Sequence, residues 1–187
     1  GNQRWGIAVY SKPRAGSNSI VNNTVVLNGN GIAVKNGLNE VIANNIVVDN
    51  TGWQFEKVEP IAILDGGDPR KSKIVIDYNL CLPPLKGGGP HPVFGDPLFL
   101  DKAKGTFYLK AGSPAIGQGS KEYAPKGDFF GRPLRENRPP DLGCFPYDPL
   151  LLSPQMRRDW YYQWPFLFRG HADTIPDFWN IPGPSDS

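Results

Sequence analysis

The chain has 187 residues and a formal net charge of only +2 at pH 7, from 20 basic and 18 acidic side chains. This near-balance argues against a dedicated nucleic-acid surface, and no apolar run approaches the length of a membrane-spanning helix. The 22 glycines and 20 prolines interrupt helical patterns throughout the chain, so the composition favours a β-rich, loop-rich protein.

The first part of the chain repeats itself. The stretch "IVNNTVVLN" (20–28) aligns without gaps with "IANNIVVDN" (42–50), and "GIAV" (6–9) recurs at 31–34. Looser copies of these two motifs follow: "PIAI" (60–63) and "VIDYNLCL" (75–82). Periods in the twenties, with short β-branched runs and no helical periodicity, predict short β-strands that coil and stack as a solenoid.

An asparagine occupies the equivalent bend in three of these copies, as Asn23, Asn45 and Asn79. We expect these residues to adopt the left-handed conformation that a sharp corner needs, because asparagine tolerates it better than most residues. Stacking also allows the side-chain amide of one copy to donate to the next in a ladder. The three asparagines are therefore predicted to be structural rather than catalytic.

The two cysteines, Cys81 and Cys144, are too few for a disulfide scaffold and lack the spacing of a metal site. Two alternatives stay open for them. They form one bridge in an oxidising compartment, or they are two buried thiols.

The chain resembles the right-handed parallel β-helix proteins of the pectate-lyase-like group. The coil motifs "NNTVV", "NNIVV" and "DYNLCL" carry part of this resemblance. The segment "GDPLFLDKAKGTFYLKAGSPAIGQG" (95–119), followed by "DFFGRPLRENRPPDLGCF" (128–145), is similar to the segment that closes many secreted members. Gly117 stands where an aspartate is common in that segment, and "LGCFP" replaces the usual ending. The resemblance covers roughly residues 6–147.

The resemblance implies an all-β fold, a right-handed parallel β-helix (solenoid) with a C-terminal cap and an irregular aromatic-rich tail. We expect β-helix coils over residues 1–94, closing coils and a cap over 95–147, and an aromatic- and Pro-rich extension over 148–187.

The closing segment has the residues that a stopper for a solenoid needs. A last coil without a cover exposes an apolar cross-section and unpaired strand edges. Pro114 removes a ladder donor and turns the chain, so it is predicted to be structural. Asp128, Arg132 and Asp141 are expected to form a polar lid by hydrogen bonds and an ion pair.

Enzymes of the resembling group cleave acidic polysaccharides with a Lys or Arg base and calcium-bound carboxylates. The outward-facing charged residues of the coils are candidates for carbohydrate or metal contacts: Lys35, Asp49, Lys57, Glu59, Asp65, Asp68 and Arg70. In "LDGGDPRKSK" (64–73), Asp65 and Asp68 are close enough in sequence to share a Ca²⁺ ion. The alternative is a solvated loop between coils. No lysine matches a catalytic motif of the group, so no catalytic residue is assigned, and His91 and His171 are interpreted as ordinary loop residues.

The composition changes after residue 147, where a dense run of aromatic side chains begins. The candidates for partner binding in this tail are Trp160, Tyr161, Tyr162, Trp164, Phe166, Phe168 and Trp179. Three interpretations stay open. The tail folds back over the solenoid, it stacks against sugars, or it docks into a partner protein.

The resemblance implies an extracellular, periplasmic or cell-surface protein directed at acidic polysaccharides, although no secretory leader is visible in the chain. Lyases of this fold bind substrate along many consecutive coils, whereas only about three or four coils precede the closing segment. We therefore expect binding rather than cleavage by this chain alone. The alternative is a non-catalytic structural subunit that docks to a partner through its aromatic tail.

Overall fold

The computed structural model describes residues 3–10, 17–35, 39–52, 58–64, 73–129 and 131–149. These residues form strands and loops without an α-helix. Nine of these strands pair in three parallel sheets of three strands each. The first sheet contains β1 (Trp5–Tyr10), β4 (Asn30–Lys35) and β7 (Ile61–Leu64), in this order. The second contains β2 (Ser19–Val21), β5 (Val41–Ala43) and β8 (Val75–Asp77), and the third contains β3 (Thr24–Val26), β6 (Ile46–Val48) and β9 (Leu80–Cys81).

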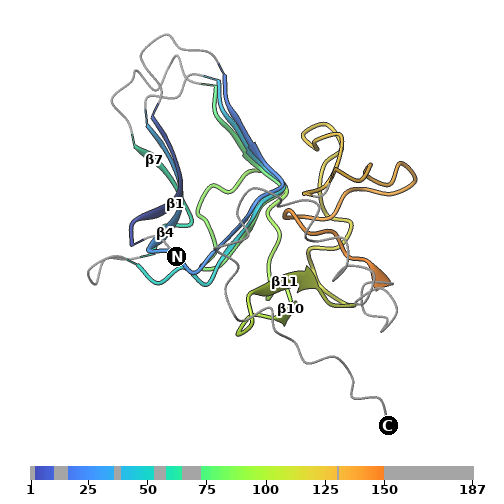
Figure 1. The fold of residues 1–187 in the computed structure, drawn as a ribbon. Coiled ribbons are helices and arrows are strands. Elements are labelled where there is room, and N and C mark those ends of the chain that lie inside the picture. The colour runs from blue at the N-terminus through green and yellow to red at the C-terminus, as the bar shows by residue number, and fades with distance from the viewer. Residues whose placement is uncertain are drawn as a thin grey trace, which may run out of the picture.

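Each sequence repeat supplies one strand to each sheet. Repeat 1 contains β1 to β3, repeat 2 contains β4 to β6, and repeat 3 contains β7 to β9. The pairing register follows the sequence alignment, because Ser19 pairs with Val41 and Ile7 pairs with Ile32. In Figure 1 the sheets form three sides of a triangle, with β1, β4 and β7 on the left. The predicted parallel stacking is confirmed, and the arrangement is β-helix-like.

The three sheets share one apolar core. The inner core consists of these buried residues: Ile20, Val25, Ile32, Val34, Ile42, Val47, Ile61 and Cys81. All three sheets contribute, because alternate residues of each strand point to the same side. Gly31 allows repeats 2 and 3 to approach closely, since a Cβ there would lie 2.0 Å from the Pro60 carbonyl oxygen.

The asparagine ladder runs along one corner of the triangle. The backbone N–H and Nδ2 of Asn23 donate to Asn45 Oδ1 at 2.9 and 3.0 Å, and those of Asn45 donate to Asn79 Oδ1 at 3.0 and 2.9 Å. The expected left-handed conformation lies one residue earlier than predicted, with φ of 52°, 57° and 51° at Asn22, Asn44 and Tyr78. Asn23, Asn45 and Asn79 instead direct their side chains along the stack. The predicted ladder is therefore confirmed, and the left-handed conformation predicted for these three residues is wrong.

Residues 82–94 cover the end of the stack beyond repeat 3. Leu85 packs against the inner core, and Val93 pairs in parallel with Leu80. Asp77 at the end of β8 accepts hydrogen bonds from the backbone N–H and the ring Nδ1 of His91, at 2.8 and 2.9 Å. His91, predicted to be an ordinary loop residue, therefore fastens this end cover to the last repeat.

The strands of the closing segment do not continue the parallel stack as further coils. β10 (Phe99–Asp101) and β11 (Thr106–Leu109) form an antiparallel hairpin, which lies outside the triangle in Figure 1. A second core joins this hairpin to the outer face of the sheet formed by β3, β6 and β9. Its buried residues are Ile46, Val48, Leu80, Phe99, Leu109, Ala115 and Leu142.

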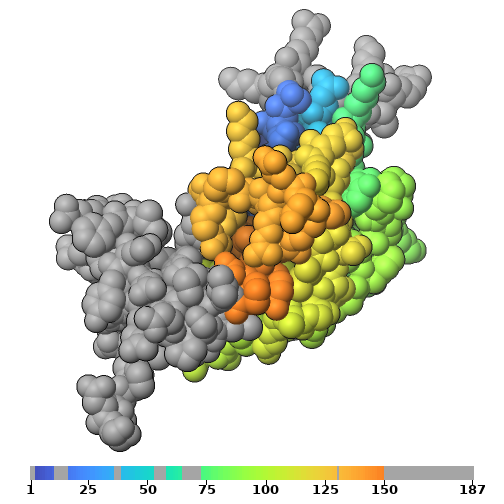
Figure 2. Space-filling model, turned by 90° about the vertical axis from the view of Figure 1, so that its right-hand side faces the viewer, coloured from blue at the N-terminus to red at the C-terminus, as the bar shows by residue number. Residues whose placement is uncertain are grey.

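The rest of the closing segment lies along the asparagine corner rather than over the end of the stack. Asn22 in repeat 1 donates from Nδ2 to the Asp141 carbonyl oxygen at 3.0 Å, and Asn44 in repeat 2 donates to the Ser120 carbonyl oxygen at 2.9 Å. Figure 2 shows this segment, yellow to orange, beside strands of repeats 1 to 3 in blue, cyan and green. The cap expected at the end is thus a cover on the side.

Candidate functional site

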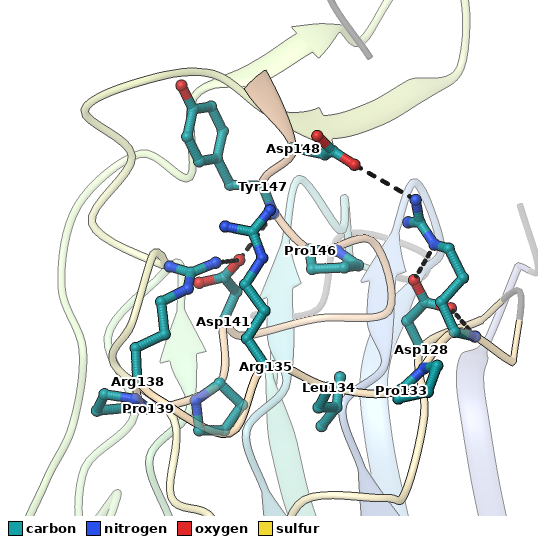
Figure 3. A pocket seen from close by; sticks show the side chains of 12 residues that line it. Asp128, Pro133, Leu134, Arg135, Arg138, Pro139, Asp141, Pro146, Tyr147 and Asp148 are labelled. Atoms are coloured by element: carbon teal, nitrogen blue, oxygen red, sulfur yellow. Dashed lines mark hydrogen bonds and ion pairs between the residues drawn. The ribbon is translucent and has the colours of Figure 1, made fainter. Parts of the chain in front are cut away.

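A pocket of about 180 Å³ opens within the closing segment (Figure 3). Its walls are Asp128, Arg132, Pro133, Leu134, Arg135, Arg138, Pro139, Pro140, Asp141, Pro146, Tyr147 and Asp148. Nucleotide-sized ligands occupy pockets of about 300–1,000 Å³, so this one suits a single small group.

Three arginines from one short stretch of the chain line this pocket. They stand three residues apart in the Pro-rich stretch "GRPLRENRPP" (131–140). A turn at Glu136 and Asn137 separates Arg135 from Arg138, and all three arginines line the pocket. A tight turn starts the stretch, because Arg132 donates from its backbone N–H to Asp128 Oδ1 at 3.0 Å. The Pro140 carbonyl oxygen accepts from the Gly119 N–H at 2.8 Å, which ties the far end down.

Two of the three guanidinium groups are paired with carboxylates. Arg132 Nε donates to Asp128 Oδ2 at 2.7 Å, and Arg132 Nη1 lies 3.4 Å from Asp148 Oδ2. Arg138 Nη2 donates to Asp141 Oδ2 at 2.9 Å. The sequence predicts hydrogen bonds and an ion pair among Asp128, Arg132 and Asp141, and the structure has an ion pair between Asp128 and Arg132.

Asp141 has almost no capacity left for a ligand. Its side chain is 1% exposed, and Oδ1 accepts from the Gly117 N–H at 2.8 Å. Oδ2 accepts from the Tyr147 N–H at 2.8 Å as well as from Arg138. This carboxylate holds three parts of the closing segment together, which agrees with a structural role.

Two guanidinium groups of the pocket have donors without a partner among the described residues. Arg135 is exposed at the pocket wall and has no ion pair with a described residue, and Figure 3 shows its guanidinium beside Tyr147. The buried Nε–H of Arg138 has no hydrogen-bond partner among the described residues. Guanidinium groups match planar carboxylates in geometry and charge. The pocket is therefore chemically suited to a carboxylate flanked by an apolar ring.

The structure places two of the predicted carbohydrate or metal candidates outside this pocket. Lys35 lies exposed at the end of β4. Asp49 has a left-handed backbone with φ of 54°, and its Oδ2 accepts from Lys102 Nζ at 2.8 Å. This contact raises the pKa of Lys102, mainly through the hydrogen bond. Asp49 therefore anchors the hairpin of β10 and β11 to repeat 2.

Other predicted site residues lie outside the described residues: Lys57, Asp65, Asp68 and Arg70. Glu59 is exposed and forms backbone contacts, accepting from Gly31 N–H at 3.0 Å and donating to Asn30 Oδ1 at 2.9 Å. Within the described ranges, no three His, Cys, Asp or Glu side chains gather as metal ligands. The Ca²⁺ ion predicted at Asp65 and Asp68 stays a prediction.

The partner-binding candidates of the tail, Trp160 to Trp179, also lie outside the described residues. Both cysteines are free thiols, with Cys81 buried and Cys144 half-buried. No helix in the part of the chain that the structure describes has the length and apolar character to span a membrane.

Sequence reasoning did not identify Arg135, Arg138 and Tyr147 as site residues. The spacing of the arginines does not predict their shared pocket, because a turn at Glu136 and Asn137 interrupts the stretch between Arg135 and Arg138. The chain matches no protein-family model, no curated protein and no solved structure.

Proposed function

We propose that this chain binds acidic polysaccharides outside the cell, with a uronate carboxylate held by Arg135 and Arg138. The observation that carries the proposal is the exposed Arg135 guanidinium, together with the unpartnered Nε–H of Arg138, in a pocket that suits a single small group such as a carboxylate. The prolines and Tyr147 around them offer apolar surface to the C–H faces of a sugar ring.

The fold also supports this proposal at the level of family. A right-handed parallel β-helix of the pectate-lyase-like kind accounts for three parallel sheets around a shared core. Connections between parallel strands of one sheet are right-handed in about 98% of cases, which favours this handedness. We propose that the chain belongs with the secreted, carbohydrate-directed proteins of that fold.

Binding rather than cleavage is the activity proposed. In the pocket, Asp141 is saturated by hydrogen bonds, and Asp128 is held by the Arg132 side chain and backbone. Neither carboxylate is placed to exchange protons with a ligand. The alternative function, docking to a partner through the aromatic tail, stays a prediction because its residues lie outside the described ranges.

The test compares retention of the full chain and its variants in gels that contain polygalacturonate, alginate or hyaluronan. Arg135→Ala is expected to weaken binding about 10- to 100-fold, because a hydrogen bond to a charged group contributes roughly 1.5–3 kcal/mol. Arg135→Lys keeps the charge but loses the planar guanidinium, so its affinity should lie between that of the unmodified chain and that of Arg135→Ala.

Lys126→Ala is the matched control, because Lys126 is an exposed cation of the same segment outside the pocket. It should bind like the unmodified chain. Equal losses in the Lys126 and Arg135 variants would show non-specific charge attraction and reject the proposed site. Absence of retention on all three polymers would reject the function itself.

A further inference from the structure

A second cluster lies at the end of the stack, where Asp77, Tyr78, His91 and Tyr123 meet. The Asp77 side chain is 8% exposed, and Oδ1 accepts from the backbone N–H of Tyr78 and of His91 at 2.9 and 2.8 Å. Oδ2 lies 2.9 Å from His91 Nδ1. A carboxylate can only accept, so Nδ1 carries a proton in this contact, and in the neutral ring Nε2 is the acceptor on the other edge.

The imidazole of His91 is both fixed and accessible. Its side chain is 56% exposed, although the buried Asp77 fixes its orientation. The ring stacks on Tyr78 with centroids 4.4 Å apart and an interplanar angle of 15°. Tyr123 adds a third ring, 6.4 Å from Tyr78 and tilted by 56°. The result is a small aromatic cluster in which the partly exposed His91 ring lies over Tyr78, with an oriented ring nitrogen at its edge.

Tyr78 occupies a backbone position that disfavours it. The equivalent corner residues of repeats 1 and 2 are Asn22 and Asn44, which tolerate positive φ, whereas Tyr78 has φ of 51°. Leu27 and Leu98 share this backbone region, with φ of 59° and 52°, so the strain by itself does not mark a site. The third copy differs from the other two in placing an aromatic ring where they place an amide.

The surroundings point to a saccharide as the ligand. The closing segment covers the corner at Asn22 and Asn44 by hydrogen bonds from their side chains, but Tyr78 presents its ring to His91 and Tyr123. Flat aromatic surfaces take the apolar C–H faces of sugar rings, and an acceptor at the edge takes a hydroxyl. Asn22, Asn44 and Tyr78 follow one another along one corner of the stack.

We infer that Tyr78, His91 and Tyr123 form a saccharide subsite, with a sugar ring stacked on the aromatic cluster and a hydroxyl donating to His91 Nε2. This inference rests on the proposed function, because the sugar belongs to the polysaccharide whose carboxylate the arginine pocket holds. Asp77 is a positioning residue in the subsite.

The experiment uses the full chain with fluorescent oligogalacturonate, oligomannuronate and oligoguluronate, and with neutral xylohexaose and cellohexaose. Tyr78→Asn should lower the affinity for the bound acidic oligosaccharide about 3- to 10-fold, whereas Tyr78→Phe keeps the ring and the affinity. Tyr10→Ala is the matched control, because Tyr10 is an exposed tyrosine at the end of β1.

Folding and binding are separated in the same variants. Tyr78→Asn is expected to keep the melting temperature within a few degrees, because the relaxed corner offsets the lost ring contact. A ¹⁵N spectrum of the histidine rings gives the second measurement. The ligand should shift Nε2 of His91 while its Nδ1 signal stays in place, and Asp77→Asn should abolish this pattern.

The outcomes separate the two proposals. Loss of acidic-oligosaccharide binding in Arg135→Ala, with unchanged affinity in Tyr78→Asn, upholds the proposed function and overturns the subsite. If the unmodified chain binds a neutral oligosaccharide but no acidic one, and Tyr78→Asn abolishes this binding, the subsite is supported and the proposed function is rejected. Absence of binding to every oligosaccharide overturns both.

Discussion

Asn45 shows how much one residue does in this fold. Its side chain is fully buried. Nδ2 donates to Asn79 Oδ1 and to the Ile20 carbonyl oxygen, at 2.9 and 2.8 Å, and Oδ1 accepts from Asn23. The residue thus joins three repeats.

Asn45→Ala is predicted to destabilise the protein by at least about 2 kcal/mol, because each buried polar group that loses its partner costs about 1–3 kcal/mol. Urea unfolding followed by circular dichroism measures the loss. Thr51→Ala, at an exposed side chain with bonds of 3.4 Å, is the control and should stay within about 0.5 kcal/mol. A similarly small effect of Asn45→Ala would mean that the ladder does not hold the repeats together.

The reactivity of the Cys81 thiol depends on its burial in the inner core. Burial raises its pKa from 9.0 to about 12, and burial also raises the pKa of Cys144. Because the folded pKa lies above the unfolded one, the neutral buried thiol contributes stability fully below pH 9, and this contribution is lost as the pH rises from 9 toward 12.

Alkylation of Cys81 by iodoacetamide at pH 8.5 is therefore expected to be at least about a hundredfold slower in the native protein than in urea, because both the thiolate fraction and access are reduced. The experiment uses Cys144→Ser, which leaves one thiol, and mass spectrometry to follow labelling. Equal rates in the two conditions would place Cys81 outside the core.

Among the elements, the sheet of β3, β6 and β9 is the one that packs against apolar cores on both of its faces. Val47 points into the inner core, while Ile46 and Val48 point to the hairpin of β10 and β11. Leu142 is fully buried against that second face. The closing segment therefore depends on apolar packing as much as on its hydrogen bonds.

Leu142→Ala is predicted to cost about 2–5 kcal/mol, the range for a leucine deleted from a core. Leu134→Ala, at a half-buried position of the pocket wall, should cost clearly less. Chemical denaturation of the two variants checks the difference. Equal costs would indicate that the closing segment does not pack on the sheet.

The sequence predicted the stacked strands well, because the alignment shift is itself the pairing register. The corner residue predicted from the sequence lies one position after the observed one in each copy. Both residues of "NN" suit a left-handed corner, and in the third copy a tyrosine disfavours the position that is actually left-handed. The side position of the closing segment was missed. The all-apolar run of Ile46, Val47 and Val48 indicates a strand buried on both faces, and it was interpreted only as a coil of the stack.

At the scale of the whole molecule, the proposed binding site exists only because distant segments meet. The Asp141 carboxylate accepts hydrogen bonds from the backbone N–H groups of Gly117 and Tyr147. The side chain of Asn22 in repeat 1 donates to the Asp141 carbonyl oxygen. The shared pocket of the arginines is not predictable from their spacing, because a turn at Glu136 and Asn137 interrupts the stretch. Their pairing is not predictable either, because it depends on which carboxylate lies near each arginine in the folded chain.

The central claim is that Arg135 and Arg138 bind a uronate carboxylate. The most direct measurement is the arginine Nε–H spectrum of the full ¹⁵N-labelled chain, assigned with Arg135→Lys and Arg138→Lys, during titration with short oligogalacturonate, oligomannuronate and oligoguluronate. If these two arginines bind a uronate, at least one of these ligands shifts both signals along a common saturating curve. Signals that stay unmoved by all three ligands at low ionic strength would contradict it.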